Sequence, residues 1–101
     1  GPIKAALIHM AKGLARQHAA TGIRVNTVSP GMVYFEGGIW HTVKTNMPEF
    51  FEQANARNPM GRCATPQEIA NAAVFLASPL SSYTTGANLI VDGAVSNRVN
   101  F

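Results

Sequence analysis

The turn Ser29-Pro30-Gly31 is the place in this sequence where a ligand could approach the backbone closely. It follows Ile23–Val28, an apolar and β-branched stretch with the composition of a buried strand. Proline lacks the N–H that would extend a central strand, and glycine allows backbone angles closed to other residues, so the chain is expected to turn sharply. In open α/β sheets, ligands bind at this carboxyl edge of the strands.

Aromatic side chains follow the turn closely, at Tyr34, Phe35 and Trp40. They either face a ligand or cover the core, and the residues alone leave both interpretations open. The stretch in which they lie, 32–63, is long for a connection between core elements, and such stretches tend to be lids or binding loops. The sequence therefore predicts that this segment lines whatever site the strand edge forms.

The elements that must position these residues are marked by periodicity and by capping signals. Apolar residues recur at helical spacing from Pro2 to Ala20, and Gly22 suits a helix C-cap. Thr65 with Glu68 forms a capping-box pattern, which predicts a helix start. The expected order is helix 2–20, strand 23–28, irregular segment 32–63, a helix ended by Ser78-Pro79, and strand Ala87–Val91. Within segment 32–63 a helix is expected to begin at Pro48, with Phe50, Phe51 and Ala54 facing inward.

This order gives an α/β chain with two parallel strands joined by a crossover. Two such strands do not make a sheet that can stand alone, so neighbouring strands outside this sequence are expected. The tail 94–101 has no periodicity, and its terminal Phe101 is a candidate for docking on a partner.

Composition bounds the remaining possibilities. The chain has 101 residues, at most one domain, with 47% hydrophobic and only 13% charged residues. The charged share is about half the usual one, which indicates a surface covered by another part of the protein or by a subunit. The net charge of +3 is scattered, so no nucleic-acid patch is predicted. His9 and His18 lack a carboxylate or cysteine at ligand spacing, and no metal site is predicted.

The number of cysteines and the hydropathy of the chain indicate in which cellular compartment the protein is expected. Cys63 is the only cysteine, so no internal disulfide can form, and a reducing cytoplasm fits best. No apolar run approaches the about 20 residues needed to span a bilayer. The expectation is a soluble cytoplasmic protein without a membrane partner.

Several short motifs occur together in a characteristic order and spacing. They are Gly1-Pro2-Ile3-Lys4-Ala5-Ala6, Gly22-Ile23-Arg24-Val25-Asn26 with Ser29-Pro30-Gly31, Gly61-Arg62 with Thr65-Pro66-Gln67-Glu68-Ile69-Ala70, Phe75-Leu76-Ala77-Ser78, and Thr85-Gly86 with Val91-Asp92-Gly93. Each is weak alone. In this order, from Gly1 to Gly93, they resemble the C-terminal part of the short-chain dehydrogenases/reductases, single-domain nicotinamide enzymes with a doubly wound, Rossmann-type parallel sheet.

The resemblance implies a catalytic role for Lys4. The family's active site has a tyrosine followed four residues later by a lysine, so the tyrosine would immediately precede Gly1. Residues four apart share one helix face, and an ammonium there lowers the pKa of the phenol so that it can exchange a proton with the substrate oxygen. In the family the same lysine also holds the ribose hydroxyls. The alternative interpretation of Lys4 is a solvated charge in a first helical turn.

The resemblance also assigns the cofactor contact, NAD or NADP, to Pro30, Gly31, Met32 and Val33. The glycine would let the nicotinamide ring approach, and the backbone near Val33 would bind its carboxamide. This chain departs from the family at Phe35, where a threonine hydroxyl often helps to fix the cofactor. Residues 32–63 correspond to the variable substrate segment, with Tyr34, Phe35 and Trp40 as candidate substrate contacts.

The implied whole is an NAD(P)-dependent oxidoreductase that interconverts an alcohol and a carbonyl compound by hydride transfer. The glycine-rich phosphate loop, the residue that selects NAD or NADP, and the active-site serine and tyrosine would lie upstream, so 1–101 alone is expected to be inactive. A homodimer or homotetramer formed through helix 2–20, with Ala11 and Ala15 at the contact, or through strand 87–91 is also implied. The alternative is a non-catalytic oligomerisation or interaction module derived from the same fold.

Overall fold

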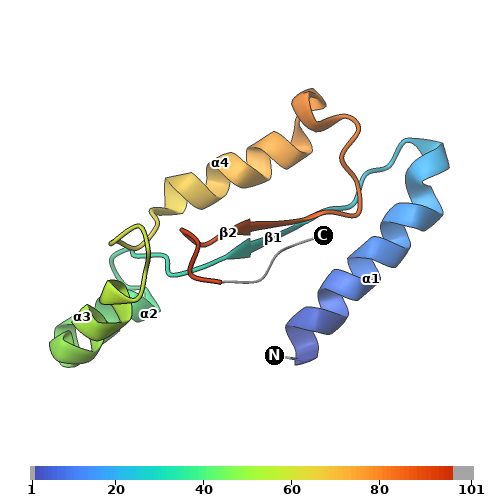
Figure 1. Cartoon of the computed structure of the whole chain (residues 1–101). Helices are drawn as coiled ribbons and strands as arrows, with labels where there is room; N and C mark the ends of the chain where they lie inside the picture. The colour runs from blue at the N-terminus through green and yellow to red at the C-terminus, as the bar shows by residue number, and fades with distance from the viewer. Residues whose placement is uncertain (1, 97–101) are drawn as a thin grey trace. The chain divides into compact units, whose positions relative to one another are not determined.

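The structure of the chain is a computed structural model that describes residues 2–96 (Figure 1). The strands β1 and β2 pair in parallel as a two-stranded sheet, which confirms the expected α/β class. No helix within the described range is long and apolar enough to cross a membrane. Phe101 lies outside the described residues. The elements in order are α1 (Pro2–His18), η1 (Ala19–Thr21), β1 (Thr27–Pro30), α2 (Ile39–Asn46), α3 (Pro48–Ala56), α4 (Pro66–Ala77), η2 (Pro79–Ser81) and β2 (Asn88–Val91).

The chain forms two compact units. The first runs up to Ser29 and then takes in Asn71–Leu89, so it holds α1, η1, most of β1 and the C-terminal half of α4. The second comprises Pro30–Ala70 and the described residues from Ile90 onward, and it holds α2, α3 and the residues that follow the two strands.

The first helix ends close to its predicted position. α1 stops at His18, and one turn of 3₁₀ helix, η1, carries the chain to Thr21. Gly22 follows with a φ of 82°, and its N–H donates to the Ala19 carbonyl at 3.1 Å. A left-handed residue with no Cβ penalty stops the helix, as the sequence predicts.

The first strand lies later than predicted, and the expected strand Ile23–Val28 is wrong at both ends. Around Val25 and Asn26 a single backbone bond, from Gly86 N–H to the Val25 carbonyl at 2.7 Å, is flanked by side-chain bonds: Val25 N–H donates to Thr85 Oγ1, and Ala87 N–H donates to Asn26 Oδ1. Regular pairing starts only with β1, where Thr27 N–H donates to the Ala87 carbonyl at 2.9 Å. β2 likewise begins at Asn88, one residue after the predicted start.

Pro30 ends β1 but belongs to it. Thr27 and Gly31 both donate their N–H groups to residues of the β2 segment, Ala87 and Val91. Because N–H groups of alternate residues point to the same side of a strand, the even-numbered Pro30 faces away from β2. Its missing N–H therefore costs no hydrogen bond in this sheet, and the strand continues two residues past its predicted end at Val28.

Arg24 joins the segment before β1 to the C-terminal end of α4. Its guanidinium donates to the carbonyl oxygens of Leu76 at 2.8 Å, Ser78 at 3.1 Å and Thr84 at 3.2 Å, and to Ser81 Oγ at 3.0 Å. The last carbonyls of a helix lack partners within the helix, and its C-terminus favours a cation. One side chain thus satisfies the end of α4 and the turn that leads to β2.

The segment 32–63 is less irregular than predicted, because it contains α2 as well as α3. α3 begins at Pro48, as its proline and first-turn Glu49 indicate. The two helices pack against each other (Figure 1). The expected inward placement holds for Phe51, which is half-buried, but is wrong for Phe50, which is 53% exposed at the surface of α3.

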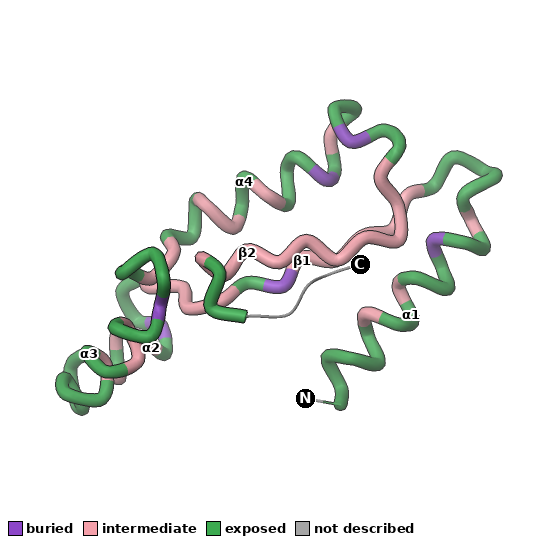
Figure 2. Tube along the Cα trace, in the orientation of Figure 1, coloured by how far each residue is buried: buried purple, intermediate pink, exposed green. Residues whose placement is uncertain are grey.

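Few of the described residues are buried, as the colours along the chain trace show (Figure 2). Ala15 and Leu76 are the buried hydrophobic ones, whereas Ile3, Leu7 and Met10 on α1 are more than half exposed. Ala15 is 2% exposed because it packs in its own unit, where a Cβ on Gly86 would lie 3.3 Å from it. The expectation that Ala15 forms part of a subunit contact is therefore wrong.

Replacing Arg24 with methionine should lower the free energy of unfolding by about 2 to 3 kcal/mol, since carbonyl oxygens at the end of α4 lose a charged donor. Urea unfolding measures the loss. Arg16→Met, which removes the same charge from the exposed face of α1, serves as the matched control. Equal stability of the two variants would show that the Arg24 hydrogen bonds add nothing to folding.

Candidate functional site

The turn after β1 is held against the end of β2. Gly31 N–H donates to the Val91 carbonyl at 3.0 Å. A Cβ placed on Gly31 would lie 2.7 Å from the Cβ and 2.8 Å from the Cα of Asp92, closer than real Cβ contacts allow. The neighbouring strand end therefore accounts for the glycine at this position without any ligand.

The next three residues form a short ladder with Ala64. The Ala64 N–H donates to the Met32 carbonyl at 2.7 Å, and the Tyr34 N–H donates to the Ala64 carbonyl at 2.9 Å. Val33 and Ala64 thus form an isolated parallel bridge that joins the two ends of segment 32–63. In such a bridge the N–H and C=O of the central residue point away from the partner. Within residues 2–96 these two Val33 groups have no hydrogen-bond partner.

An aromatic cluster lies inside segment 32–63. The ring centroid of Phe51 is 6.0 Å from that of Tyr34 and 6.4 Å from that of Trp40, both edge-to-face. His41 lies 5.9 Å from Tyr34, and the Lys44 ammonium lies 5.3 Å from the Tyr34 centroid. These are the distances of favourable aromatic and cation–π contacts. Tyr34 and Trp40 are thus brought together through Phe51.

Phe35 is separate from that cluster. It is 50% exposed, and its ring lies over Gly38, where an added Cβ would come within 2.7 Å of Cζ. Gly38 N–H donates to the Phe35 carbonyl at 3.0 Å, which closes a tight turn before α2. Of the three predicted substrate-facing aromatics, two therefore pack together and the third covers a turn.

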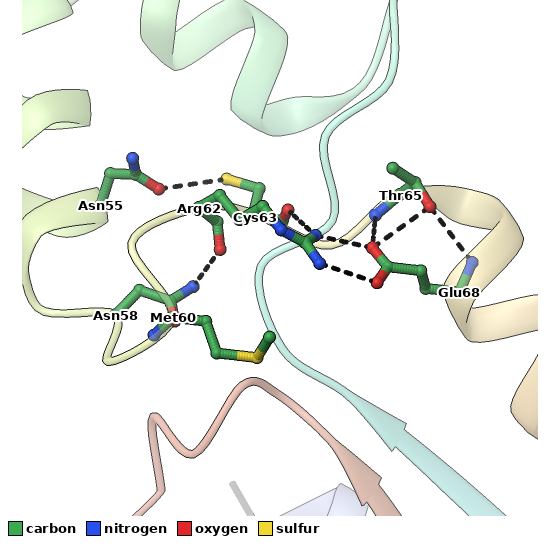
Figure 3. A network of polar contacts seen from close by, with 7 residues as sticks. All are labelled: Asn55, Asn58, Met60, Arg62, Cys63, Thr65 and Glu68. Atoms are coloured by element: carbon green, nitrogen blue, oxygen red, sulfur yellow. Dashed lines mark hydrogen bonds and ion pairs between the residues drawn. The ribbon is translucent and has the colours of Figure 1, made fainter.

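A polar network holds the far end of the segment to the start of α4 (Figure 3). Arg62 and Glu68 form a two-pronged ion pair with N–O distances of 2.7 and 3.0 Å. Thr65 N–H donates to Glu68 Oε1 at 2.9 Å, and Glu68 N–H donates to Thr65 Oγ1 at 3.2 Å. This confirms the predicted capping box. The hydrogen bonds from Arg62 and Thr65 lower the pKa of Glu68 to about 2.

Asn58, which sequence reasoning missed, lies in the turn between α3 and Arg62. Only 5% of it is exposed, and its carboxamide accepts from Met60 N–H and donates to the Arg62 carbonyl (Figure 3). A cavity of about 80 Å³ beside it is lined by Met32, Asn58, Met60 and Asp92 among others. An asparagine followed by a proline is typical of an exposed turn, so the sequence does not indicate that Asn58 is buried.

Within residues 2–96, the candidate Lys4 has no such polar surroundings. Lys4 is exposed in the first turn of α1, in the first unit, whereas the strand-end turn lies in the second. The Cys63 thiol has a pKa raised by partial burial, an effect that the nearby Lys44 ammonium opposes. The described residues contain no cluster of three or more His, Cys, Asp or Glu side chains that could hold a metal ion.

Comparisons with known proteins find close relatives. The family model described as enoyl-(acyl carrier protein) reductase matches residues 1–96. Isoepoxydon dehydrogenase from Aspergillus clavatus is 45% identical over the whole chain, which covers 39% of that protein. Galactitol 2-dehydrogenase (L-tagatose-forming) from Cereibacter sphaeroides is 48% identical over 89% of the chain and 34% of its own length.

The solved structures agree. The structure of YwfH, an NADPH-dependent reductase involved in bacilysin biosynthesis, superposes with a TM-score of 0.83 at 33% identity. The matched region covers 94% of this chain and 38% of the YwfH chain. The chain thus spans about two fifths of the length of the relatives it matches.

The Glu68 ion pair predicts a pH-dependent stability. A carboxyl whose pKa falls from 4.5 to about 2 on folding stabilises the folded state above pH 4.5. That contribution is lost as the pH falls through about 2. The difference in unfolding free energy between the wild type and Glu68→Gln should therefore be constant near neutrality and shrink in acid. Urea midpoints measured across the range test it, with Glu52→Gln on α3 as the control for the charge change. A difference independent of pH would contradict the prediction.

Proposed function

The chain belongs to the short-chain dehydrogenase/reductase family, and from this premise we propose that the complete protein is an NAD(P)-dependent oxidoreductase. It interconverts an alcohol and a carbonyl compound by hydride transfer. The chain supplies the nicotinamide end of the cofactor site, the catalytic lysine and the substrate segment 32–63 of a single Rossmann-type domain. A nicotinamide held at this site would supply the acceptor or donor of the hydride.

One observation carries this proposal: the backbone groups of Val33 at the carboxyl edge of the sheet. A carboxamide has one C=O acceptor and one NH₂ donor, and Val33 offers one N–H and one C=O without partners in residues 2–96. The bridge to Ala64 fixes the direction in which both groups point. Pro30, Gly31 and Met32 place Val33 beyond the strand end, where ligands of such sheets bind.

Lys4 has a different role in this proposal. The family's tyrosine lies one helical turn before the lysine, so an ammonium on the same helix face would stabilise the phenolate. That tyrosine then exchanges a proton with the substrate oxygen as hydride moves at carbon. The same ammonium would hold the ribose hydroxyls. Exposure of Lys4 in the first turn of α1 leaves its charge accessible to both.

The substrate class is the broadest part of the proposal. The segment that contains Tyr34, Phe35 and Trp40 is closed at its base by the Val33–Ala64 bridge. This closure supports the proposal that the segment lines one side of a small-molecule site. Relatives named as galactitol and isoepoxydon dehydrogenases support small hydroxylated compounds as first candidates. A panel of secondary alcohols and polyols, with both NAD and NADP, is therefore the first assay for the complete protein.

Lys4→Met in the complete protein should lower kcat by about a hundredfold or more, the scale of lost acid–base catalysis, with an unchanged unfolding midpoint. Arg16→Met removes a charge from the same helix and should keep full activity. Wild-type turnover that survives in Lys4→Met would remove Lys4 from the mechanism. Absence of both turnover and reduced-cofactor binding in the wild type would overturn the oxidoreductase proposal and favour the non-catalytic module.

We also propose a homodimer or homotetramer, supported by the exposed apolar row Ile3, Leu7 and Met10 on α1 and by the low charge. An arginine in place of Met10 would have to be desolvated at such a contact, so association should weaken about tenfold or more. Light scattering at dilute concentration measures the mass, with Arg16→Met again as control. An unchanged assembly would show that this face is not a subunit contact.

A further inference from the structure

We propose that Asn58 is a positioning residue for the nicotinamide end of the site, acting through the backbone of residues 62–64. The inference rests on the proposed function, because the segment that it positions is the one that would hold the carboxamide. Asn58 touches neither cofactor nor substrate in this proposal. It sets the place of Ala64, and Ala64 in turn sets the direction of the Val33 backbone groups.

The first step is the satisfaction of Asn58 itself. Its Oδ1 accepts from Met60 N–H at 3.1 Å, which leaves Nδ2 to donate to the Arg62 carbonyl. Its own N–H donates to the Asn55 carbonyl at 3.1 Å, and its C=O accepts from Gly61 N–H at 2.8 Å. A side chain that is 5% exposed and paired at both ends holds the turn in one shape.

The second step leads from this turn to the strand edge. Only Cys63 separates Arg62, whose carbonyl Asn58 binds, from Ala64, which carries both rungs of the ladder to Met32 and Tyr34. The Arg62 guanidinium is also paired with Glu68, but that ion pair is exposed and holds the side chain of Arg62, not its backbone carbonyl. Asn58 is thus the interior contact that fixes residue 62.

The third step is that the turn has room to shift when this contact is lost. The cavity of about 80 Å³ lies between Asn58, Met60, Met32 and Asp92. A Cβ on Gly93 would lie 3.0 Å from Asn58 Oδ1, so the carboxamide also fills the space beside the end of β2. Without its hydrogen bonds, residues 60–64 can move toward the cavity and turn the Val33 groups away from a fixed ligand.

The test compares Asn58→Asp and Asn58→Ala in the complete protein. A protonated aspartic acid can donate to the Arg62 carbonyl as the amide does, whereas the ionised form sets a carboxylate against that carbonyl. Burial favours the neutral acid, so its pKa should rise. Relative to the wild type at each pH, Asn58→Asp should bind the reduced cofactor about tenfold more weakly at high pH and recover as the pH falls. Asn58→Ala should be weakened at every pH.

Three readouts separate positioning from mere stability. Fluorescence titration gives the Kd of the reduced cofactor, steady-state kinetics gives KM and kcat separately, and hydrogen exchange reports the Tyr34 and Ala64 amides. We expect KM for the cofactor to rise with kcat within about threefold, and both amides to exchange faster. Asn46→Asp, the same chemical change at an exposed site ending α2, should follow the wild type at every pH.

A Kd ratio within twofold of unity at all pH values, with unchanged exchange of the two amides, would overturn the inference. So would a loss of stability and kcat without a change in cofactor affinity. If Asn58→Ala does not fold, the pH course of Asn58→Asp decides alone. If the wild type itself binds no nicotinamide cofactor, the proposed function fails, and the exchange rates of Tyr34 and Ala64 still decide whether Asn58 positions the ladder.

Discussion

The Arg24 guanidinium is the contact on which the first unit depends. It gathers the Leu76, Ser78 and Thr84 carbonyls around one cation, and Ser81 completes the set from a buried position. Within the part of the chain that the structure describes, the side chains that also donate to those carbonyls are neutral, the Ser81 hydroxyl and the Asn26 carboxamide. Because Arg24 immediately precedes the paired residues Val25 and Asn26, the same contact brings residues 84–87 alongside them and starts β2 in register with β1.

Register then determines what the strand edge presents. Once Thr27 faces Ala87, alternation places Gly31 against the β2 end, where Asp92 leaves no room for a Cβ. Two residues further, the bridge to Ala64 uses the groups of Met32 and Tyr34 and leaves those of Val33 unpaired in residues 2–96. The alternation of backbone direction along residues 27–34 therefore explains why Pro30 is tolerated, why residue 31 is a glycine and where the Val33 backbone groups point.

Sequence reasoning succeeded where one residue type has one physical role. Gly22 in the left-handed region, Pro48 at a first helical turn and the Thr65–Glu68 capping box all lie as predicted. It failed where a side chain replaces backbone pairing, as Asn26 does for the predicted strand. It also failed for α2, whose β-branched residues favour strands. There Thr42 and Thr45 donate back to the Gly38 and His41 carbonyls, and packing on α3 outweighs propensity.

Only part of the site could be predicted from the sequence, because some of its contacts are made by residues far apart in the chain. The composition of turn 29–31 indicates a turn, but the residues that hold the chain just after it are chemically ordinary and distant in sequence. Ala64 pairs with Met32 and Tyr34, and Asn58 binds the Arg62 carbonyl. Ala64 acts only through its backbone, which the residue type does not reveal. From the sequence alone, a buried asparagine cannot be told from one at the surface. Contacts of this kind follow from tertiary structure, so no local pattern encodes them.

The bridge at the base of segment 32–63 separates the interior of the segment from the strand edge. Val33 and Ala64 join the ends of the segment, so changes between them leave the strand edge in place. Closing a longer loop costs little extra, since each doubling of length adds only about 0.6 kcal/mol. The interior has its own packing, with Phe51 between Tyr34 and Trp40. Side chains on α2 and α3 can therefore vary while the Val33 backbone groups keep their direction.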